Sequence, residues 1–281
     1  MHHAASPIGI FDSGIGGLSV LQALREELPA EPLVYVADSG HAPYGERDQA
    51  FVQQRTAAVA RHLRAHCGIK ALVIACNTAT AAAVEQLRRE MPDLLLIGVE
   101  PALKPAAQSS QTHHVGVMAT RGTVGSARFA RLLGEHSQHT RFSVQACDGL
   151  ALAIEQATGQ PAPTRLQDGA LWAHCARHTE ALGSFGRNAG EIDTLVLGCT
   201  HYIFVKDELR ALLGPDIALI DTGTAVARQV RRLLQQSGLL APEGLPPQIQ
   251  LFATGGLSSL QAAAQRWLQL PPGSCAHIDI G

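Results

Sequence analysis

LVIACNTATAAAVEQLRRE, residues 72–90, joins a short buried strand, a polar corner and a helix in direct succession. Four apolar residues, 72–75, predict the strand, and the alanine-rich run that follows predicts the helix. We expect Asn77 or Thr78 to cap this helix, because either side chain can accept hydrogen bonds from the free N–H groups of the first turn. Cys76 is therefore expected at a strand end and beside a helix N-terminus, where the helix dipole favours a thiolate.

A second stretch, TLVLGCTHYIFVKDELRALL at residues 194–213, repeats this arrangement. Its apolar strand runs into Cys199, Thr200 and His201, and a helix is expected directly afterwards. Two matching corners, each with a cysteine at its tip, predict two similar half-sites that face one cleft.

Composition limits the class of protein. A chain of 281 residues fits about two domains, and 46% hydrophobic with 16% charged residues is typical of a globular protein. A net charge of −2 gives no reason to expect nucleic acid or an anionic membrane as a partner. No apolar run approaches the roughly 20 residues of a membrane helix. The N-terminal residues lack the pattern of a secretory signal, so we expect a cytoplasmic protein.

The six cysteines resemble no small disulfide framework, and a cytoplasmic setting would keep them reduced. The three lysines, at 70, 104 and 206, lie outside any convincing Schiff-base setting. We therefore expect no pyridoxal phosphate.

Strands and helices alternate along the whole chain in units of about 30 residues, which predicts parallel sheets joined by right-handed crossovers. A Gly/Pro interruption is expected at 159–163 within a mostly helical segment, and a loop at 241–247. The expected strands lie at residues 8–11, 33–38, 72–75, within 94–103, at 115–119, 142–147, before Cys199, at 218–223 and 249–254, with one more near the end of the chain.

Polar side chains gather where these strands are expected to end. Open α/β sheets bind ligands at the carboxyl ends of their strands. The set is rich in Thr, Ser and Asn and has few basic groups, which suits a small polar ligand. Its members are Asp12, Ser13, Asp38, Tyr44, Gly45, Cys76, Asn77, Thr78, Thr120, Thr123, Cys199, Thr200, His201 and Asp221.

The glycine-rich turn at residues 14–19 resembles a degenerate dinucleotide-binding fingerprint, with Asp38 at the end of the next strand. Against this interpretation, Asp12 and Ser13 precede the first glycine, and Ser19 stands where close packing requires Gly or Ala. We favour a tight turn that begins a helix over a nicotinamide site.

Several uses of the cysteines compete. A single cysteine at a strand end is usually a small buried apolar residue. Zinc is the second alternative, but the clusters at 62–67 and 174–178 lack the paired cysteine spacing of a structural site, so no metal is expected. A cysteine hydrolase needs one nucleophile with a base and an oxyanion hole. Two cysteines in matching settings suit a reaction that removes a proton from one face of a carbon and returns one to the opposite face.

Six motifs carry a resemblance to a known family: FDSGIGGLSVL, PYGER, ACNTAT, GVEPAL, GVMATRGTVGSARF and VLGCTHY, in this order. From about residue 8 to 230 the chain resembles the glutamate racemases of the aspartate/glutamate racemase superfamily. The two cysteine corners alone would indicate only the superfamily, whereas the DSGIGG turn with Asp38 and PYG at 43–45 is specific to the glutamate branch. The resemblance implies cofactor-independent interconversion of L- and D-glutamate, which supplies D-glutamate for peptidoglycan.

The resemblance also implies roles for individual residues. Cys76 would remove the α-proton of D-glutamate and Cys199 that of L-glutamate, supported by Asp12 and His201 respectively. Glu155 is a further candidate on the second side. The substrate-binding positions implied are Asp12, Ser13, Tyr44, Gly45, Asn77, Thr78, Thr120, Thr123, Thr200 and His201, with no metal and no cofactor.

The implied fold is two pseudo-symmetric α/β domains of parallel sheets that face each other across the active-site cleft. The first domain would comprise residues 1–99 and 225–281, and the second 100–224. A homodimer is also implied. Ile203 departs from the proline that the family usually has there, which would pre-set the first helical turn.

Two alternatives remain open. The first is a superfamily relative that acts on aspartate or another acid, such as a decarboxylase or a hydantoin racemase, although decarboxylating relatives generally keep only one of the two cysteines. The second is a small-ligand-binding protein on the same fold, with gyrase as a partner, as for some racemases of the family.

Overall fold

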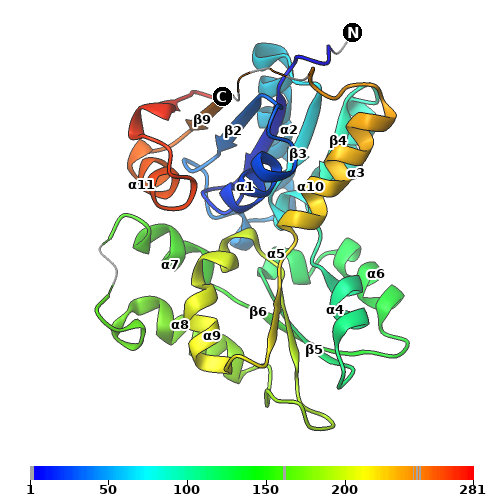
Figure 1. Cartoon of the computed structure of the whole chain (residues 1–281), viewed down its shortest axis with the longest axis vertical. Coiled ribbons are helices and arrows are strands. Elements are labelled where there is room, and N and C mark those ends of the chain that lie inside the picture. The colour runs from blue at the N-terminus through cyan, green and yellow to red at the C-terminus, as the bar shows by residue number, and fades with distance from the viewer. Residues whose placement is uncertain (1–2, 161–162, 243, 245, 247) are drawn as a thin grey trace.

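The computed structural model describes residues 3–160, 163–242, 244, 246 and 248–281. It contains two parallel β-sheets, each covered by helices on both faces (Figure 1). We call the first sheet with its helices the first lobe and the second sheet with its helices the second lobe. Parts of the interruption expected at 159–163 and of the loop expected at 241–247 lie outside the described residues.

The first lobe contains a six-stranded sheet in the order β10-β9-β2-β1-β3-β4, with every pair of neighbours parallel. Its strands are β1 (Ile8–Asp12), β2 (Leu33–Ala37), β3 (Ala71–Ile74), β4 (Leu95–Gly98), β9 (Ile249–Ala253) and β10 (Cys275–His277). Its helices are α1 (Leu18–Glu27), η1 (Tyr44–Glu46), α2 (Gln49–Cys67), α3 (Asn77–Glu90), α10 (Gly223–Gln236), α11 (Leu257–Leu268) and η4 (Pro272–Ser274).

The second lobe contains a four-stranded parallel sheet in the order β6-β5-β7-β8. Its strands are β5 (His114–Ala119), β6 (Arg141–Ala146), β7 (Thr194–Leu197) and β8 (Ala218–Ile220). Its helices are α4 (Leu103–Ser109), α5 (Arg121–Val124), α6 (Ala127–His136), α7 (Leu150–Ala157), η2 (Leu166–Asp168), α8 (Ala170–Glu180), η3 (Thr200–Val205) and α9 (Lys206–Leu213).

Burial on both faces explains the nearly continuous apolar strands of each lobe. Every residue of β1, β2 and β3 is buried, because α1, α10 and α11 pack on one face of the first sheet and α2 and α3 on the other. Parallel strands covered in this way lose the alternation of apolar and polar residues. The prediction of parallel α/β sheets in two facing units is confirmed.

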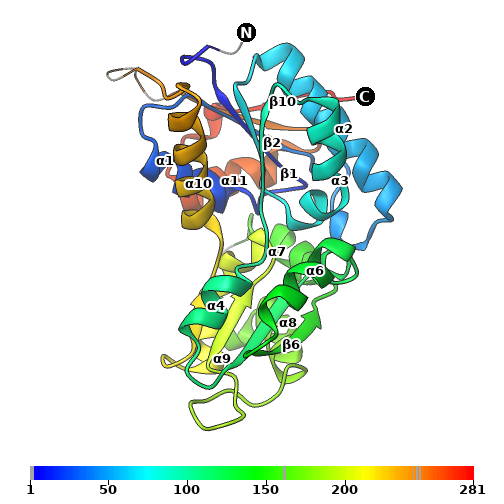
Figure 2. The same ribbon diagram turned by 90° about the vertical axis from the view of Figure 1, so that its right-hand side faces the viewer.

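The chain passes between the lobes twice, between β4 and α4 and again between β8 and α10 (Figure 2). The second passage returns the chain to the first sheet, where β9 pairs with β2 and β10 pairs with β9. The strand expected at 218–223 ends at Ile220 because the Asp221 carboxylate accepts a hydrogen bond from the N–H of Gly223, the first residue of α10.

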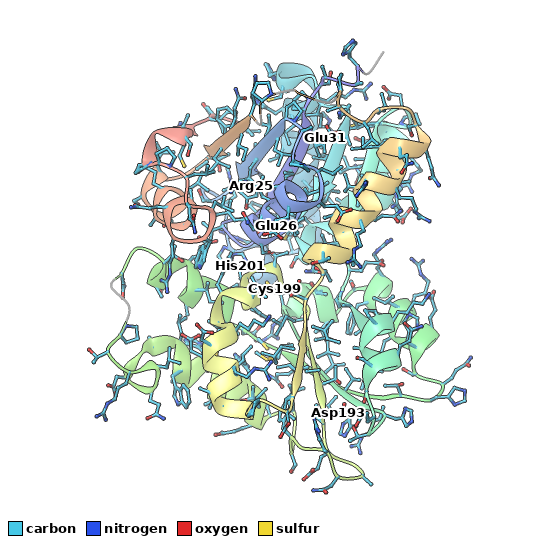
Figure 3. The ribbon with its side chains drawn as sticks, in the orientation of Figure 1. Arg25, Glu26, Glu31, Asp193, Cys199 and His201 are labelled. Carbon is cyan, nitrogen blue, oxygen red and sulfur yellow. The ribbon has the colours of Figure 1, made fainter. Side chains whose placement is uncertain are left out.

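Asp193, far from the boundary between the lobes (Figure 3), ties the loop after α4 to the start of β7. Its carboxylate accepts hydrogen bonds from the Ser110 hydroxyl at 2.6 Å and from the backbone N–H groups of Gln111 and Thr112 at 2.6 and 2.9 Å. Burial alone would raise the pKa of Asp193, but these hydrogen bonds lower it below its ordinary value.

We expect Asp193→Ala to lower the free energy of unfolding by roughly 2–4 kcal/mol, because it strips several donors of a charged acceptor. Since the folded pKa is lowered, this stabilisation is present above the unfolded pKa near 3.8 and is lost as the pH falls through the folded pKa. Urea unfolding at pH 7 and at about pH 3 measures both effects. The control is Asp216→Ala, which removes only an exposed ion pair with Arg187 and should cost at most about 1 kcal/mol. Equal losses for the two variants at pH 7 would contradict this account.

Candidate active site

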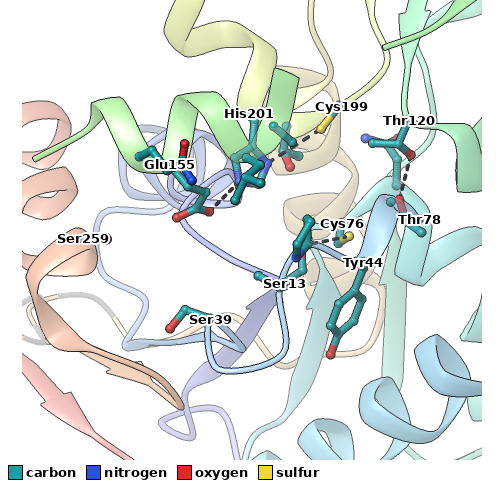
Figure 4. A pocket seen from close by; sticks show the side chains of 18 of the residues that line it. Ser13, Ser39, Tyr44, Cys76, Thr78, Thr120, Glu155, Cys199, His201 and Ser259 are labelled. Atoms are coloured by element: carbon teal, nitrogen blue, oxygen red, sulfur yellow. Dashed lines mark hydrogen bonds and ion pairs between the residues drawn. The ribbon is translucent and has the colours of Figure 1, made fainter. Parts of the chain in front are cut away.

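A cavity of about 260 Å³ lies between the carboxyl ends of the two sheets. Cys199 and His201 stand at the boundary of the lobes (Figure 3), and Figure 4 shows both lobes contributing side chains to the cavity wall. Eleven residues that the sequence singled out line it: Ser13, Tyr44, Gly45, Cys76, Asn77, Thr78, Thr120, Glu155, Cys199, Thr200 and His201.

Cys76 caps α3 with its own side chain. Its sulfur accepts a hydrogen bond from the N–H of Ala79 at 3.5 Å and lies 3.8 Å from the Ser13 hydroxyl. The prediction that Asn77 or Thr78 caps this helix is therefore wrong. The strand β3 ends at Ile74 and α3 already begins at Asn77, so Cys76 occupies the capping position. Burial, and then the nearby charge of Asp12, raises the pKa of Cys76 well above its ordinary value.

Freed from capping, the side chains of Asn77 and Thr78 serve the cavity. Asn77 is only 4% exposed, and neither the nitrogen nor the oxygen of its amide group has a hydrogen-bonding partner among the described residues. A buried amide without partners is costly, so this side chain is suited to a ligand. The Thr78 hydroxyl lies 2.9 Å from the Thr120 hydroxyl and so links the two lobes.

Cys199 has different neighbours. The expected helix does not begin directly after it: the short 3₁₀ helix η3 comes first, and α9 begins only at Lys206. The Nδ1 atom of His201 lies 3.7 Å from the Cys199 sulfur, and its Nε2 atom lies 2.7 Å from a carboxylate oxygen of Glu155. Burial alone would lower the pKa of His201, but the hydrogen bonds to Cys199 and Glu155 raise it well above the ordinary value. The imidazole thus lies between the sulfur and the carboxylate, and its raised pKa favours the protonated form.

Asp12 stands behind the cavity wall. Its carboxylate accepts hydrogen bonds from the N–H groups of Ser13 at 2.7 Å and Gly17 at 2.5 Å, and from the Thr200 hydroxyl at 3.3 Å. Burial raises the pKa of Asp12, although the charge of His201 and the two N–H donors oppose this. Thr123 is also set back, where its hydroxyl oxygen accepts a hydrogen bond from the Thr120 hydroxyl at 3.0 Å.

The glycine turn packs tightly against the second lobe. A Cβ atom on Gly16 would lie 2.3 Å from Nδ1 of His201, and one on Gly14 would lie 1.9 Å from Glu155 Oε1. The same Glu155 oxygen accepts a hydrogen bond from the N–H of Ile15 at 2.7 Å. Because the N–H of Ile15 already donates to a carboxylate of the second lobe, it is not free to bind a pyrophosphate, and the turn does not support the dinucleotide interpretation.

Asp38 is also engaged within the protein. It accepts hydrogen bonds from Arg55, from the Thr254 hydroxyl at 2.7 Å and from the Tyr44 hydroxyl at 2.5 Å. Burial raises its pKa, but Arg55 and these hydroxyl groups lower it below the ordinary value. Burial and the Asp38 charge raise the pKa of Tyr44, so Tyr44 stays neutral and its ring is held as a wall of the cavity.

Several lining residues were not anticipated. Ser39 follows β2, Gln156 lies on α7, and Ser258 and Ser259 lie in the first turn of α11. The sequence could have indicated Ser258 and Ser259, because the expected strand at 249–254 is followed by polar residues, as are the other strands that end at the cavity. The remaining unanticipated members are Ala42, Ala151, Leu152 and Gly256, while Pro43 belongs to the PYG motif that the sequence singled out.

Within the described residues, no group of three or more His, Cys, Asp or Glu side chains is arranged to hold a metal ion. Among the described helices, none combines the length and apolar character needed to cross a membrane.

Two facing α/β lobes with a buried cysteine of each lobe in one polar cavity define a class of enzyme that acts on small polar molecules. Residues 8–230 match the model of the Asp/Glu/Hydantoin racemase family, and the chain belongs to this family. The glutamate racemase of Ectopseudomonas mendocina is 46% identical to this chain over 282 residues, and the alignment covers 100% of each of the two proteins. The chain therefore stands among the glutamate racemases, a group of isomerases, as the motifs predicted.

Solved structures of glutamate racemases have the same fold as this chain. The glutamate racemase isoform RacE1 of Bacillus anthracis superposes with a TM-score of 0.83 at 32% identity, covering 99% of this chain and 98% of that one. The Escherichia coli glutamate racemase, solved with L-glutamate and the activator UDP-MurNAc-Ala, gives a TM-score of 0.81 at 28% identity over 98% of this chain and 99% of that one.

We expect Gly16→Ala to lower kcat/KM for glutamate at least about 10-fold. The added Cβ would lie 2.3 Å from Nδ1 of His201 and 2.7 Å from the Thr200 hydroxyl oxygen, and would displace both side chains. The control is Gly134→Ala, on an exposed helix surface where a Cβ meets nothing within 4 Å. Racemisation followed by circular dichroism measures both. Wild-type activity in Gly16→Ala would show that the turn does not set the position of His201.

Proposed function

We propose that this protein racemises glutamate by a two-base mechanism in which Cys76 and Cys199 act on opposite faces of the substrate, without a cofactor. The single observation that carries the proposal is one cavity that is lined by a buried cysteine from each lobe (Figure 4). Glutamate as substrate is supported by relatives, among them the Francisella tularensis glutamate racemase solved with D-glutamate, which gives a TM-score of 0.81 at 25% identity.

In the direction from L-glutamate, the Cys199 thiolate removes the α-proton and Cys76 donates its thiol proton to the opposite face of the carbanion. The reverse direction exchanges these roles. A raised pKa keeps Cys76 a thiol at neutral pH, while protonated His201 places a positive charge beside Cys199. The free protein thus offers a proton donor at Cys76 and a cationic group beside Cys199, which suits removal of the proton of L-glutamate by Cys199.

The two cysteines have parallel but unequal supports. On the second side, His201 links Cys199 to Glu155. On the first side, the Ser13 hydroxyl lies 3.8 Å from the Cys76 sulfur and 3.3 Å from an Asp12 oxygen. We propose that this hydroxyl connects Cys76 to Asp12, whose raised pKa suits it to hold a proton when Cys76 must become a thiolate.

Among the described residues no Lys or Arg lines the cavity, so apart from His201 the substrate is held by neutral groups. The unpartnered amide of Asn77, the hydroxyl groups of Ser13, Thr78, Thr120 and Thr200, and the backbone of Gly45 are the proposed contacts of the carboxylates and ammonium group. Tyr44 is proposed to contribute its ring as a wall, and Thr123 to orient Thr120.

The further expectations from the sequence stand as proposals. We propose that residues 1–99 and 225–281 form one domain and 100–224 the other, which the membership of the two sheets supports. A homodimer, a cytoplasmic location and a role in supplying D-glutamate for peptidoglycan remain predictions. Rescue of a strain that needs added D-glutamate would test the last of these.

Cys76→Ser and Cys199→Ser are each expected to abolish racemisation, with losses of at least about 10²–10⁴-fold, because a serine hydroxyl is too weakly acidic to replace the thiol. Each variant should keep the elimination of chloride from one enantiomer of a glutamate analogue with chloride on Cβ, since that reaction needs one base. Cys76→Ser should act on the L form and Cys199→Ser on the D form.

The matched control is Cys175→Ser, a buried cysteine on α8 that does not line the cavity. Its racemisation without added cofactor, before and after treatment with a chelator, should match that of the wild type. Turnover near that of the wild type in either cavity variant would exclude the two-base mechanism.

His201→Asn and Asp12→Asn are expected to act on opposite sides of the reaction. Enantiomers have equal free energies in water, so kcat/KM must fall equally in both directions, and only the deuterium isotope effect can show which proton transfer has slowed. His201→Asn should increase the isotope effect with α-deuterated L-glutamate and decrease it with the D form, and Asp12→Asn should do the reverse. If both variants change the two isotope effects alike, these residues hold the substrate and do not assist individual cysteines.

A further inference from the structure

Two aromatic rings meet across the lobes beyond the cavity. Phe204 belongs to η3 of the second lobe and Trp267 to α11 of the first, and their ring centroids lie 3.6 Å apart with an interplanar angle of 10°. In Figure 1, α11 lies on the side of the first lobe that faces the second. The Arg266 guanidinium also lies near the Trp267 ring, 5.6 Å from its centroid.

Phe204 packs against the apolar cores of both lobes. One is the core that α1, α10 and α11 share with the first sheet, and the other is the core of the second lobe. Phe204 and Trp267 together line two cavities, of about 570 and 260 Å³. Because open space flanks the rings, the stack itself carries much of the contact between η3 and α11.

The short helix η3 connects this stack to the active site. A 3₁₀ helix has three residues per turn, so His201 and Phe204, three positions apart, lie on the same side of η3. This side faces the first lobe at both ends. His201 is pressed against the glycine turn, where a Cβ on Gly16 would lie 2.3 Å from its ring, and Phe204 lies on Trp267.

We infer that Phe204 and Trp267 are positioning residues, whose stack fixes η3 against the first lobe and so sets where His201 stands beside Cys199. The inference rests on the proposed role of Cys199 as a base. Neither ring lines the catalytic cavity, so any effect on the reaction must pass through η3.

The test compares Phe204→Leu and Trp267→Leu, which keep apolar bulk but lose the stack, with Trp267→Phe, which keeps an aromatic ring. Each leucine variant should lower kcat about 10-fold, the scale of a lost aromatic pair, while KM changes less than about twofold. The isotope effect with α-deuterated L-glutamate should rise and that with the D form should fall. Trp267→Phe should restore most of kcat, and the double leucine variant should lose no more than either single one.

Control variants show whether a loss of kcat is specific to the stack. Trp172→Leu removes a tryptophan from α8, outside the contact, and should leave kcat unchanged. A thermal melt of each variant shows whether it is folded, and Phe204→Leu serves if Trp267→Leu does not fold. A rise in KM with unchanged isotope effects would mean that the stack only closes the lobes and would overturn the inference. So would a wild-type kcat in both leucine variants.

The failure of this inference can be told from the failure of the two-base mechanism. If Cys199 is not a base, Cys199→Ser keeps turning over glutamate, whatever the leucine variants do. If only the positioning role is wrong, Cys199→Ser is inactive while the folded leucine variants match the wild type in kcat and in both isotope effects.

Discussion

The structure depends on the contact between the glycine turn of the first lobe and the His201–Glu155 pair of the second. Glu155 accepts a hydrogen bond from the N–H of Ile15 and another from His201, so one carboxylate holds both the turn and the imidazole. Only glycine at positions 14 and 16 allows this approach, since any Cβ there would overlap the pair. The contact holds the two lobes together beside the cavity, and both cysteines line this one cavity.

The two halves of the site are chemically unequal, although their backbones are alike. Each cysteine lies two residues after a buried strand, but only Cys76 caps an α-helix directly. Cys199 is followed by a 3₁₀ turn, which brings His201 back toward the sulfur, whereas Cys76 has a hydroxyl and a carboxyl group behind it. A thiol and an imidazole-paired sulfur are the unlike starting states that a reaction with one donor and one acceptor requires.

The sequence predicted what depends on short-range patterns. The alternation of strands and helices predicted the parallel sheets, and the polar residues after the strands supplied half of the cavity lining, with Glu155 added by the family resemblance. It could not predict features that depend on which residues meet after folding. The capping role of Cys76 depends on where β3 ends, and Ser258 and Ser259 reach the cavity only because β9 returns to the first sheet beside β2. The set-back position of Asp12 follows from Gly17 and Thr200, which lie in different lobes.

The central claim is that one cysteine removes a proton and the other delivers a different one. The most direct test starts from α-protonated L-glutamate in deuterium oxide and analyses both enantiomers by mass spectrometry before equilibrium. The account predicts that newly formed D-glutamate carries deuterium at Cα while the remaining L-glutamate keeps its original proton. D-glutamate that retains the substrate's own proton would mean that a single base carries it from one face to the other, and would contradict the account.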